Sequence, residues 1–557
     1  MVFPKTHPLM PPTDPINVLV VESQPTMRAQ LRNMLASIGY ESAHFAVSAS
    51  TAVKRLRESH FDLILCEYHL GDGQDGQHLL EDLREHEIIP LETLFVMISS
   101  EMNYQRVVST CELGPNDYIL KPLTGETLRV RLQRAFDKRD AFLPAWRSMA
   151  LGDTVGAIEC CREGRDRHPQ YAIDFMRMQA ELLLANGQLD EAEARYREIL
   201  KERAVPWAEL GLARVLVLRR HYAEAEDILL ALVGAHERYI AAYDLLSQVR
   251  AESGRPEAAR DTLTAATERS PHRLNRLRNL GELSLRVGDP AAAETSFSEV
   301  VRKGKYSDFA DPEDHVRLVQ AQLAQAKLDS AASSIADLER SAGRQPKGEL
   351  CKALCNAMLH ARAGDLARAR DALQSASRAT QRGAQLSVGL RQELIKACFD
   401  HQLGDEGTEL VGDILRTAAD ERSIESTREL LRERGLEGLS KQIEAKVQAE
   451  VKSLITTGAE KARAGDFDGA VSEMMNAARK MPGNPQVLFN AALALMRHIE
   501  HRGWNEAFAA QARGLIDRAR KLSPASPRLA ALTDFMHQQI KRYGIRPGRI
   551  MPRPRPL

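Results

Sequence analysis

Short apolar runs alternate with amphipathic stretches through the first 140 residues of the chain. The apolar runs at 18–21, 63–65, 94–98 and 118–120 are predicted to be buried strands, and residues 25–38 have the spacing of an amphipathic helix. Alternation of this kind favours a parallel sheet covered by helices on both faces. We therefore predict an α/β doubly wound, five-stranded domain, whose chemistry should gather at the carboxyl ends of the strands.

A second pattern, with a nearly fixed period, occupies most of the remaining chain. An alanine is followed four residues later by a bulky apolar residue, and the clearest pairs are Ala192 with Tyr196, Ala225 with Leu229, Ala259 with Leu263, Ala293 with Phe297 and Ala470 with Met474. The first four alanines are separated by 33, 34 and 34 residues, and weaker copies follow at Ala331 and Ala369 after intervals of 38. Such periodicity predicts helical hairpins that stack, because one hairpin cannot bury its apolar face alone.

Other residues recur at fixed sequence distances from the alanines of this pattern. Glycines lie five residues before the alanine and prolines twelve residues after it, at Gly187, Gly254, Gly288, Gly364 and Gly465 and at Pro169, Pro271 and Pro482. Small residues at Ala213, Ser247 and Gly281 allow the two helices of a hairpin to approach closely, and proline ends the second helix. We expect nine or ten hairpins, in one block or in two with a break near 415–450, and a last hairpin that ends near Pro524.

The two patterns divide the chain into four parts. A Pro-rich leader covers 1–14, the α/β domain 15–138, the helical array 139–540, and a basic tail rich in Pro and Arg 541–557. The last helix of the α/β domain, at about 125–137, runs almost directly into apolar residues 141–143, so we expect a rigid junction. The tail is expected to be extended, and it could dock on an acidic partner or a Pro-recognising domain, or simply be solvated.

The composition and the motifs argue against several classes of function. The chain has 76 basic and 76 acidic residues, so no global field attracts nucleic acid or an anionic membrane. Its seven cysteines lack paired CxxC spacing, which argues against a zinc site or a disulfide framework. We find no secretory leader and no apolar span of about 20 residues, and a cytoplasmic location is expected. Nor does the sequence contain GxxxxGK, HExxH or a well-placed GxSxG, so no catalytic role is expected.

Polar residues follow the predicted strands at their carboxyl ends. Glu22 and Ser23 come after the first strand, Glu67 after the third, Ser99 after the fourth, and Lys121 after the fifth, with Tyr118 three residues earlier. In this order and spacing the set resembles the response-regulator receiver domain, over roughly residues 15–138. The resemblance implies that an acidic pair, here Glu22 and Ser23, would hold Mg²⁺, and that the phosphoacceptor position falls on Glu67.

The same resemblance implies roles for the other three residues. Ser99 matches the hydroxyl that contacts the phosphoryl group, Lys121 the cation that pairs with that group, and Tyr118 the aromatic switch. Phosphorylation needs a carboxylate in line with the donor, and a misplacement of about 1 Å can cost on the order of 10²-fold in rate. Glu67 is one methylene too long, and Ser23 removes a ligand, so Glu22 and Glu67 would hold Mg²⁺ only weakly. No cofactor is therefore expected, and ordinary phosphotransfer is disfavoured.

Two interpretations of Glu67 stay open. Its longer side chain could imitate the phosphorylated acid and hold the switch in an active-like state. Alternatively, it could form a buried ion pair with Lys121, leaving the domain as a fixed docking surface. Asp72 and Asp75, which lie nearby in a Gly-rich segment, are interpreted as turn residues rather than as substitute acceptors.

The alanine-based repeats resemble the tetratricopeptide repeat. That resemblance implies a superhelix with a concave surface that takes up a partner's helix or extended segment. Side chains on the first helix of a hairpin, such as Arg276, Asn279 and Glu282, are candidates for lining this groove. The alternative is that the array acts only as a spacer.

Together these observations favour a non-enzymatic signal-transduction adaptor of two-component type. Its degenerate receiver would dock on a histidine kinase or another response regulator, while the array binds a second protein. The alternative is a phosphorylation-responsive regulator whose receiver gates the array. A further alternative is that the face around Tyr118 and the last receiver helix mediates self-association or lies against the first repeat. Neither nucleic acid nor membrane is expected as a partner.

Overall fold

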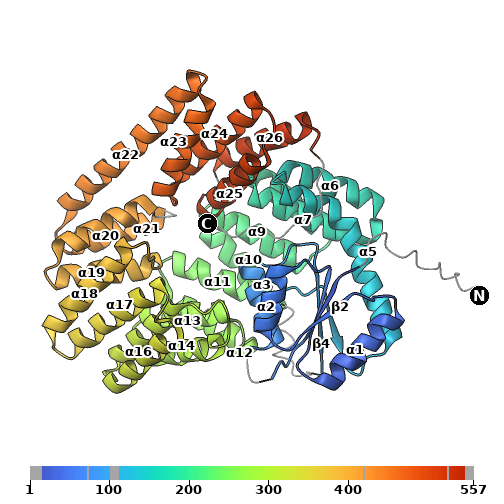
Figure 1. Cartoon of the computed structure of the whole chain (residues 1–557), viewed down its shortest axis with the longest axis horizontal. Coiled ribbons are helices and arrows are strands. Elements are labelled where there is room, and N and C mark those ends of the chain that lie inside the picture. The colour runs from blue at the N-terminus through green and yellow to red at the C-terminus, as the bar shows by residue number, and fades with distance from the viewer. Residues whose placement is uncertain (1–15, 72–73, 101–111, 418–420, 524–525, 546–557) are drawn as a thin grey trace, which may run out of the picture.

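The structure is a computed structural model that describes residues 16–71, 74–100, 112–417, 421–523 and 526–545. It consists of an α/β domain and a long array of helices that curves around it (Figure 1). The predicted leader, most of the predicted tail and Asp72 lie outside the described residues.

The α/β domain contains five parallel strands in the order β2-β1-β3-β4-β5, which confirms the predicted five-stranded sheet. The strands are β1 (Val18–Val21), β2 (Ala43–Ala46), β3 (Leu63–Glu67), β4 (Leu94–Ser99) and β5 (Asp117–Leu120). One face is covered by α1 (Pro25–Ser37) and α5 (Gly125–Ala150), and the other by α2 (Ala49–Glu58) and α3 (Gly76–Glu85). The three inner strands, β1, β3 and β4, are buried on both faces, which explains why their sequences are nearly continuous apolar runs, whereas the edge strands β2 and β5 are partly exposed.

Helix α5 joins the two parts of the chain without interruption. Leu128, Leu132 and Phe136 pack on the sheet, and two turns later Phe142 and Ala145 belong to the core of the first hairpin. The predicted boundary near residue 138 therefore lies inside a single helix of 26 residues. A continuous helix makes the junction rigid, as the sequence predicted.

Twenty-one further α-helices follow in the described residues. Their bounds are α6 (Thr154–Arg167), α7 (Ala172–Ala185), α8 (Leu189–Glu202), α9 (Pro206–Leu218), α10 (Tyr222–Ala235), α11 (Ile240–Glu252), α12 (Pro256–Arg269), α13 (Leu274–Arg286), α14 (Pro290–Gly304), α15 (Pro312–Ala324), α16 (Leu328–Ala342), α17 (Pro346–Arg362), α18 (Leu366–Gln381), α19 (Val388–Asp400), α20 (Gly404–Thr417), α21 (Glu421–Glu433), α22 (Glu437–Arg463), α23 (Phe467–Lys480), α24 (Pro485–Arg502), α25 (Glu506–Leu522) and α26 (Pro527–Arg542). A short 3₁₀ turn, Pro169–Tyr171, precedes α7.

Small and large residues interlock between paired helices as the repeat pattern predicts. A Cβ atom on Gly281 would lie 2.6 Å from the Phe297 ring, so only glycine lets α13 and α14 come this close. In the preceding hairpin Ser247 fills the equivalent place and its hydroxyl donates to the carbonyl of Ala259 at 2.8 Å. Close backbone approach between the helices thus depends on these small residues.

Around 415–450 the sequence left the organisation of the array open. Apolar packing continues through this stretch, because Leu415, Leu431 and Val447 belong to one core that extends from Val316 to Ile540. What departs from the regular repeat in this stretch is the length of α22, which has 27 residues. Beyond Pro524, where we expected the last hairpin to end, a further helix, α26, follows.

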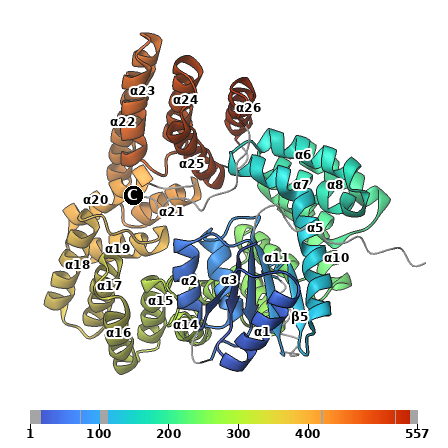
Figure 2. The same ribbon diagram turned by 45° about the vertical axis from the view of Figure 1, so that its right-hand side comes forward.

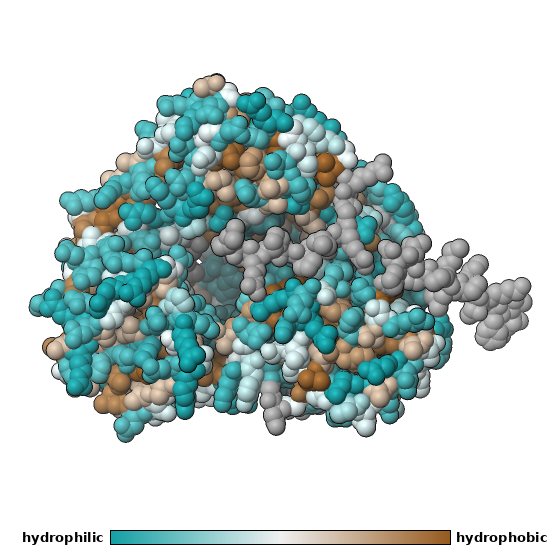
Figure 3. Space-filling model, viewed as in Figure 1, coloured by the Kyte–Doolittle hydropathy of each residue, from teal (hydrophilic) through white to brown (hydrophobic). Residues whose placement is uncertain are grey.

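Helix α26 returns to the start of the array and closes it into a ring (Figures 1 and 2). Thr533 donates to the side-chain oxygen of Asn186 at 2.8 Å, and His537 Nδ1 lies 2.6 Å from a carboxylate oxygen of Asp153. Arg513 of α25 also donates to the carbonyl of Ala150 at 2.8 Å. The space-filling view shows a hollow near the centre of this ring (Figure 3).

Among the described helices, none has the length and apolarity needed to span a bilayer.

Candidate functional site

The predicted site residues lie at the carboxyl edge of the sheet. Glu22 follows β1 and Glu67 ends β3, and both are buried, with 1% and 7% of their surface exposed. Lys121, directly after β5, places its ammonium 3.4 Å from Glu22 Oε2 and in ion-pair contact with Glu67 Oε2. The structure therefore brings these three residues together. Two buried carboxylates need such a counter-charge, because an unpaired buried charge is strongly destabilising.

Backbone amides fix the remaining oxygens of the two carboxylates. The amide of His69 donates to Glu67 Oε1 at 3.2 Å, and the amide of Gln24 donates to Glu22 Oε1 at 2.8 Å. Each glutamate thus binds Lys121 with one oxygen and its own loop with the other. The side chains are held in place by the chain segments that follow β1 and β3.

The other predicted residues stand in different positions around this pocket. Ser99 is fully buried at the end of β4, and its carbonyl accepts from the Lys121 amide at 2.8 Å. The Ser23 carbonyl accepts from Arg28 at 2.6 Å. Tyr118 packs its ring against the apolar cluster under α2 and α3. Tyr118 therefore belongs to the core on that face of the sheet.

The pocket does not fit the Mg²⁺ site that the resemblance implies. Magnesium requires several oxygen ligands in tight octahedral geometry. Here the space between the two carboxylates holds the Lys121 ammonium, and position 23 supplies a serine instead of an acid. No group of three or more His, Cys, Asp or Glu residues suited to a metal is found within the described residues.

The loop after β3 presses the start of α3 against this pocket. Gly76 is the first residue of α3, and a Cβ there would collide with the carbonyl oxygen of Glu67 and lie 2.9 Å from Cys66 Sγ. Burial, followed by the charge of Glu67, raises the pKa of the Cys66 thiol well above its usual value, so this thiol stays protonated. Asp75 caps α3 by accepting from the His78 amide at 2.9 Å.

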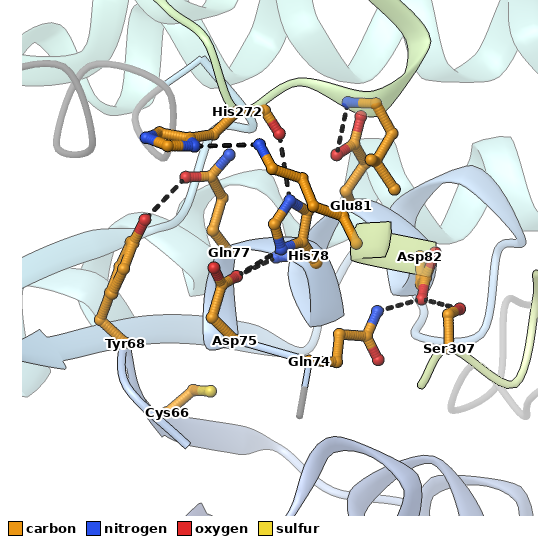
Figure 4. A network of polar contacts seen from close by, with 12 residues as sticks. Cys66, Tyr68, Gln74, Asp75, Gln77, His78, Glu81, Asp82, His272 and Ser307 are labelled. Carbon is orange, nitrogen blue, oxygen red and sulfur yellow. Dashed lines mark hydrogen bonds and ion pairs between the residues drawn. The ribbon is translucent and has the colours of Figure 1, made fainter. Parts of the chain in front are cut away.

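A network that the sequence did not predict connects α3 to the helical array (Figure 4). His78 places Nδ1 2.8 Å from Asp75 Oδ1 and Nε2 3.1 Å from the carbonyl oxygen of His272, just before α13. Both neighbours are acceptors, so only the doubly protonated imidazolium satisfies them. Burial alone would lower the pKa of His78, but the charge and hydrogen bond of Asp75 raise it above its ordinary value.

Two arginines beside His272 bind carboxylates of the α/β domain. Arg273 Nε lies 3.3 Å from Glu81 Oε1 on α3. Arg276 donates to Glu112 at 2.6 Å and to Asp244 of α11 at 2.8 Å, and only 3% of its surface is exposed. Arg276, which we expected to line an open groove, is thus covered by the chain's own α/β domain. Asn279 and Glu282, the other two candidates, are exposed.

The loop between α14 and α15 makes a second contact with the α/β domain. Ser307 donates to Asp82 at 2.6 Å, and the Phe309 ring stacks on His86 with ring centroids 4.1 Å apart. Arg57 of α2 also lies over the Phe309 ring, with its guanidinium carbon 5.3 Å from the ring centroid. A signal for this loop exists in the sequence, because the interval between Ala293 and Ala331 is 38 residues where the preceding interval is 34.

One alternative from the sequence was that the surface around Tyr118 and the last helix of the α/β domain lies against the first repeat or mediates self-association. In the structure, α2 and α3 face the array at 272–276 and 307–309, while α5 continues into the first hairpin.

Comparisons with known proteins agree with this architecture. Residues 18–133 match the response regulator receiver domain, and residues 177–240 and 245–308 match the tetratricopeptide repeat. The chemotaxis protein CheY-3 of Vibrio cholerae is 29% identical over 124 residues, which are 22% of this chain and 93% of that protein. The chemotaxis protein CheY of Pseudomonas aeruginosa is 24% identical over 123 residues, covering 22% of this chain and 98% of that protein.

Among solved structures, a tetratricopeptide repeat protein from Parabacteroides merdae is 15% identical, with a TM-score of 0.32, and covers 54% of this chain and 98% of that one. YrrB, described as a TPR protein with an unusual peptide-binding site, is 15% identical with a TM-score of 0.29 and covers 34% of this chain and 92% of that one. The periodic residues, the helical pairs and the family match identify the repeats. The chain thus joins a segment that matches the response-regulator receiver domain to a helical array that contains matches to the tetratricopeptide repeat.

Proposed function

We propose that this protein is a non-enzymatic adaptor whose receiver does not take part in phosphotransfer. The observation that carries the proposal is the closed set of charges around Glu67. Its carboxylate is engaged by Lys121 on one oxygen and by the His69 amide on the other. Each oxygen of Glu67 already has one such contact and the side chain is one methylene longer than aspartate, so attack in line on a phosphoryl donor would have to compete with these contacts from a displaced position.

The same geometry favours one of the two interpretations of Glu67. A mimic of the phosphorylated acid would direct its charge toward both Ser99 and Lys121. The contacts of Glu67 support the second interpretation, a buried ion pair that fixes the receiver in one state. The receiver then acts as a constant surface, and regulation comes from what binds to that surface.

The array is the part of the adaptor that we expect to bind a protein partner. A groove of about 1210 Å³ opens on the first helices of successive hairpins, α9, α11 and α13, and the receiver contributes Glu112 and Gly114 to its wall. Its lining includes aromatic side chains, among them Trp207 and Tyr239, together with several arginines. Surfaces of this composition anchor peptide segments. A cytoplasmic location and a histidine kinase or response regulator as partner are parts of the same proposal.

Intact-mass measurement tests the central claim. The full chain is incubated with Mg²⁺ and acetyl phosphate, beside a double variant, Glu67→Asp with Ser23→Asp, that restores the missing carboxylate and shortens the acceptor. We expect no added phosphoryl group on the wild type. Stoichiometric phosphorylation of Glu67 in the wild type would overturn the proposal and favour the phosphorylation-responsive alternative.

A further inference from the structure

The contact between receiver and array is built mainly from charges. On the array side are Arg273 and Arg276, and on the receiver side Glu81 and Glu112. Among the described residues, the apolar clusters of the two parts stay separate, except that Phe309 packs against the cluster under α2 and α3. Polar contacts between domains that have independent cores resemble transient rather than permanent interfaces.

The arginines of this contact continue into the groove beside it. Arg273 and the receiver's Glu112 both line the groove, together with Arg214 of α9 and Arg286 of α13. The four acids of the groove are each paired, because Glu112 and Asp244 bind Arg276, Glu181 binds Arg177 and Glu282 lies 3.7 Å from Arg317. Arg214 and Arg286 are exposed, and no ion pair holds either of them within the described residues. The surface that starts at Arg273 therefore carries an excess of available positive charge.

We propose that this basic surface, defined by Arg273, Arg276 and the adjoining Arg214 and Arg286, is the binding site for an acidic segment of a partner protein. The receiver's Glu81 and Glu112 occupy part of that site in this structure. The receiver thus acts as an internal competitor, and partner binding and receiver docking exclude one another at Arg273 and Arg276. This inference rests on the proposed adaptor function and names the chemistry of its partner.

The structure also sets the conditions under which the competition is effective. Helix α5 is continuous and holds the receiver beside the array, so docking takes place within one chain, and undocking requires this helix to bend, which Pro144 inside it favours. A free partner protein therefore displaces the receiver only if the docked contact is weak or if the partner also binds the additional arginines of the groove. Arg214 and Arg286, which the receiver does not engage in the described contacts, supply that advantage.

Two variants distinguish opening of the contact from loss of the binding site. Glu81→Gln with Glu112→Gln removes the receiver's carboxylates, adds no positive charge to the groove wall and leaves the array intact. Arg273→Glu, made in the full chain, also breaks the contact but destroys the binding surface. Hydrogen exchange of the α3 amides should rise in both variants, which shows that both open the receiver. Unchanged exchange in the first variant would mean that these acids do not hold the receiver, and would overturn the inference.

The probe is a fluorescein-labelled peptide with the sequence of residues 74–86 and blocked ends, followed by fluorescence anisotropy. Its neutral control carries Glu81→Gln, Asp82→Asn and Glu85→Gln. We expect the double variant to bind the acidic peptide at least about fivefold more tightly than the wild type, and the Arg273→Glu variant to bind it more weakly than either. The cost of ordering the peptide is the same for all three proteins. The ratio of their peptide affinities therefore reports how accessible and how basic the array surface is.

Equal affinity of both open variants, or no binding by the open double variant, would overturn the inference. Arg276→Gln serves as a second array-side variant, should Arg273→Glu lower the stability of α13. The result is independent of the phosphorylation experiment, because the peptide carries no phosphoryl group. A wild-type chain that is phosphorylated at Glu67 but passes the peptide test would refute the proposed constant receiver and leave the basic surface standing as the binding site for an acidic segment.

Discussion

The Glu67 pocket and the receiver–array contact around His78 both bury charged groups, but they obtain their counter-charges from different places. In the pocket, Lys121 and the loop amides come from the receiver itself. At the contact, Glu81 and Glu112 find their counter-charges at Arg273 and Arg276 of the array, whereas His78 pairs with Asp75 of its own domain and binds the array through the carbonyl of His272. A pocket that neutralises itself is fixed when the domain folds. A contact whose charges belong to two domains can exchange one partner for another.

The largest effect is expected from removing the cation of the pocket. Lys121→Met would leave Glu22 and Glu67 buried without a counter-charge, and we expect the receiver's free energy of unfolding to fall by about 3–5 kcal/mol. Hydrogen exchange of the β3 and β4 amides measures this in the full chain. The matched control is Lys54→Met on the exposed side of α2, with a change below about 0.5 kcal/mol. Equal stability of the two variants would show that the carboxylates do not depend on Lys121.

A smaller effect is expected from a substitution at Gly76, where the Glu67 pocket lies next to the α3 helix that contacts the array. Gly76→Ala places a methyl group against the carbonyl oxygen of Glu67, so the start of α3 must move. We expect a loss of about 1–3 kcal/mol and faster exchange both in β3 and at the array contact. Gly234→Ala in α10, where nothing lies within 4 Å, should instead stabilise by about 0.5–1 kcal/mol. If hydrogen exchange in the Gly76→Ala variant becomes faster only in β3, the Glu67 pocket and the receiver–array contact are independent of each other.

Phe309→Ala is expected to weaken docking without affecting the pocket. It removes the ring that stacks on His86, and aromatic pairs contribute about 0.5–1.5 kcal/mol. Exchange should rise in α2 and α3 but not in β3. Tyr306→Ala, in the same loop but 53% exposed, is the control and should change neither region. A rise in β3 exchange would mean that docking supports the receiver's own core.

The mildest perturbation is a change of pH at His78. Asp75 raises the pKa of this imidazole against the opposing effect of burial, so its contribution to docking is fully present below the ordinary value of 6.5 and is lost as the pH rises through the raised pKa. Its surroundings are Asp75 at the start of α3, Glu81 on α3, the His272 carbonyl and Lys303 of α14, whose charge opposes that of the imidazolium.

We therefore expect α3 exchange, corrected for the intrinsic pH dependence of amide exchange, to increase from mildly acidic to alkaline pH. His78→Gln should abolish this dependence, because glutamine does not titrate. The pocket should stay protected over the same range. A pH dependence that survives in His78→Gln would assign the effect to another group.

Much of the fold could be predicted from local patterns. Runs such as 18–21 and 94–98 are apolar because their strands are buried on both faces, so the pattern alone identifies them. The alanine and glycine positions identify the hairpins for a similar reason, since close helix packing tolerates little else at Gly281 or Ala213. The pocket residues were found because strands of a parallel sheet end on the same edge.

Contacts between distant segments could not be predicted in this way. Arg276 occupies a position on the first helix of its hairpin where the repeat pattern indicates a groove, and nothing near it in sequence shows that Glu112 covers it. The interval of 38 residues after Ala293 marks an inserted loop, but its length alone does not say that Phe309 meets His86. Closure of the ring by His537 and Asp153 likewise joins residues that no local pattern relates.

The sequence by itself determined the two kinds of repeat unit, strand–helix and helix–helix, and the set of residues at the edge of the sheet. These features follow from periodicity and from the fixed direction of parallel strands, both of which act over short stretches of chain. Only the tertiary structure decided that Lys121 closes the Glu67 pocket, that α3 docks on the array and that α26 completes the ring. Those contacts depend on the accumulated curvature of twenty-one helices, and a small rotation at each hairpin sets which distant charges meet.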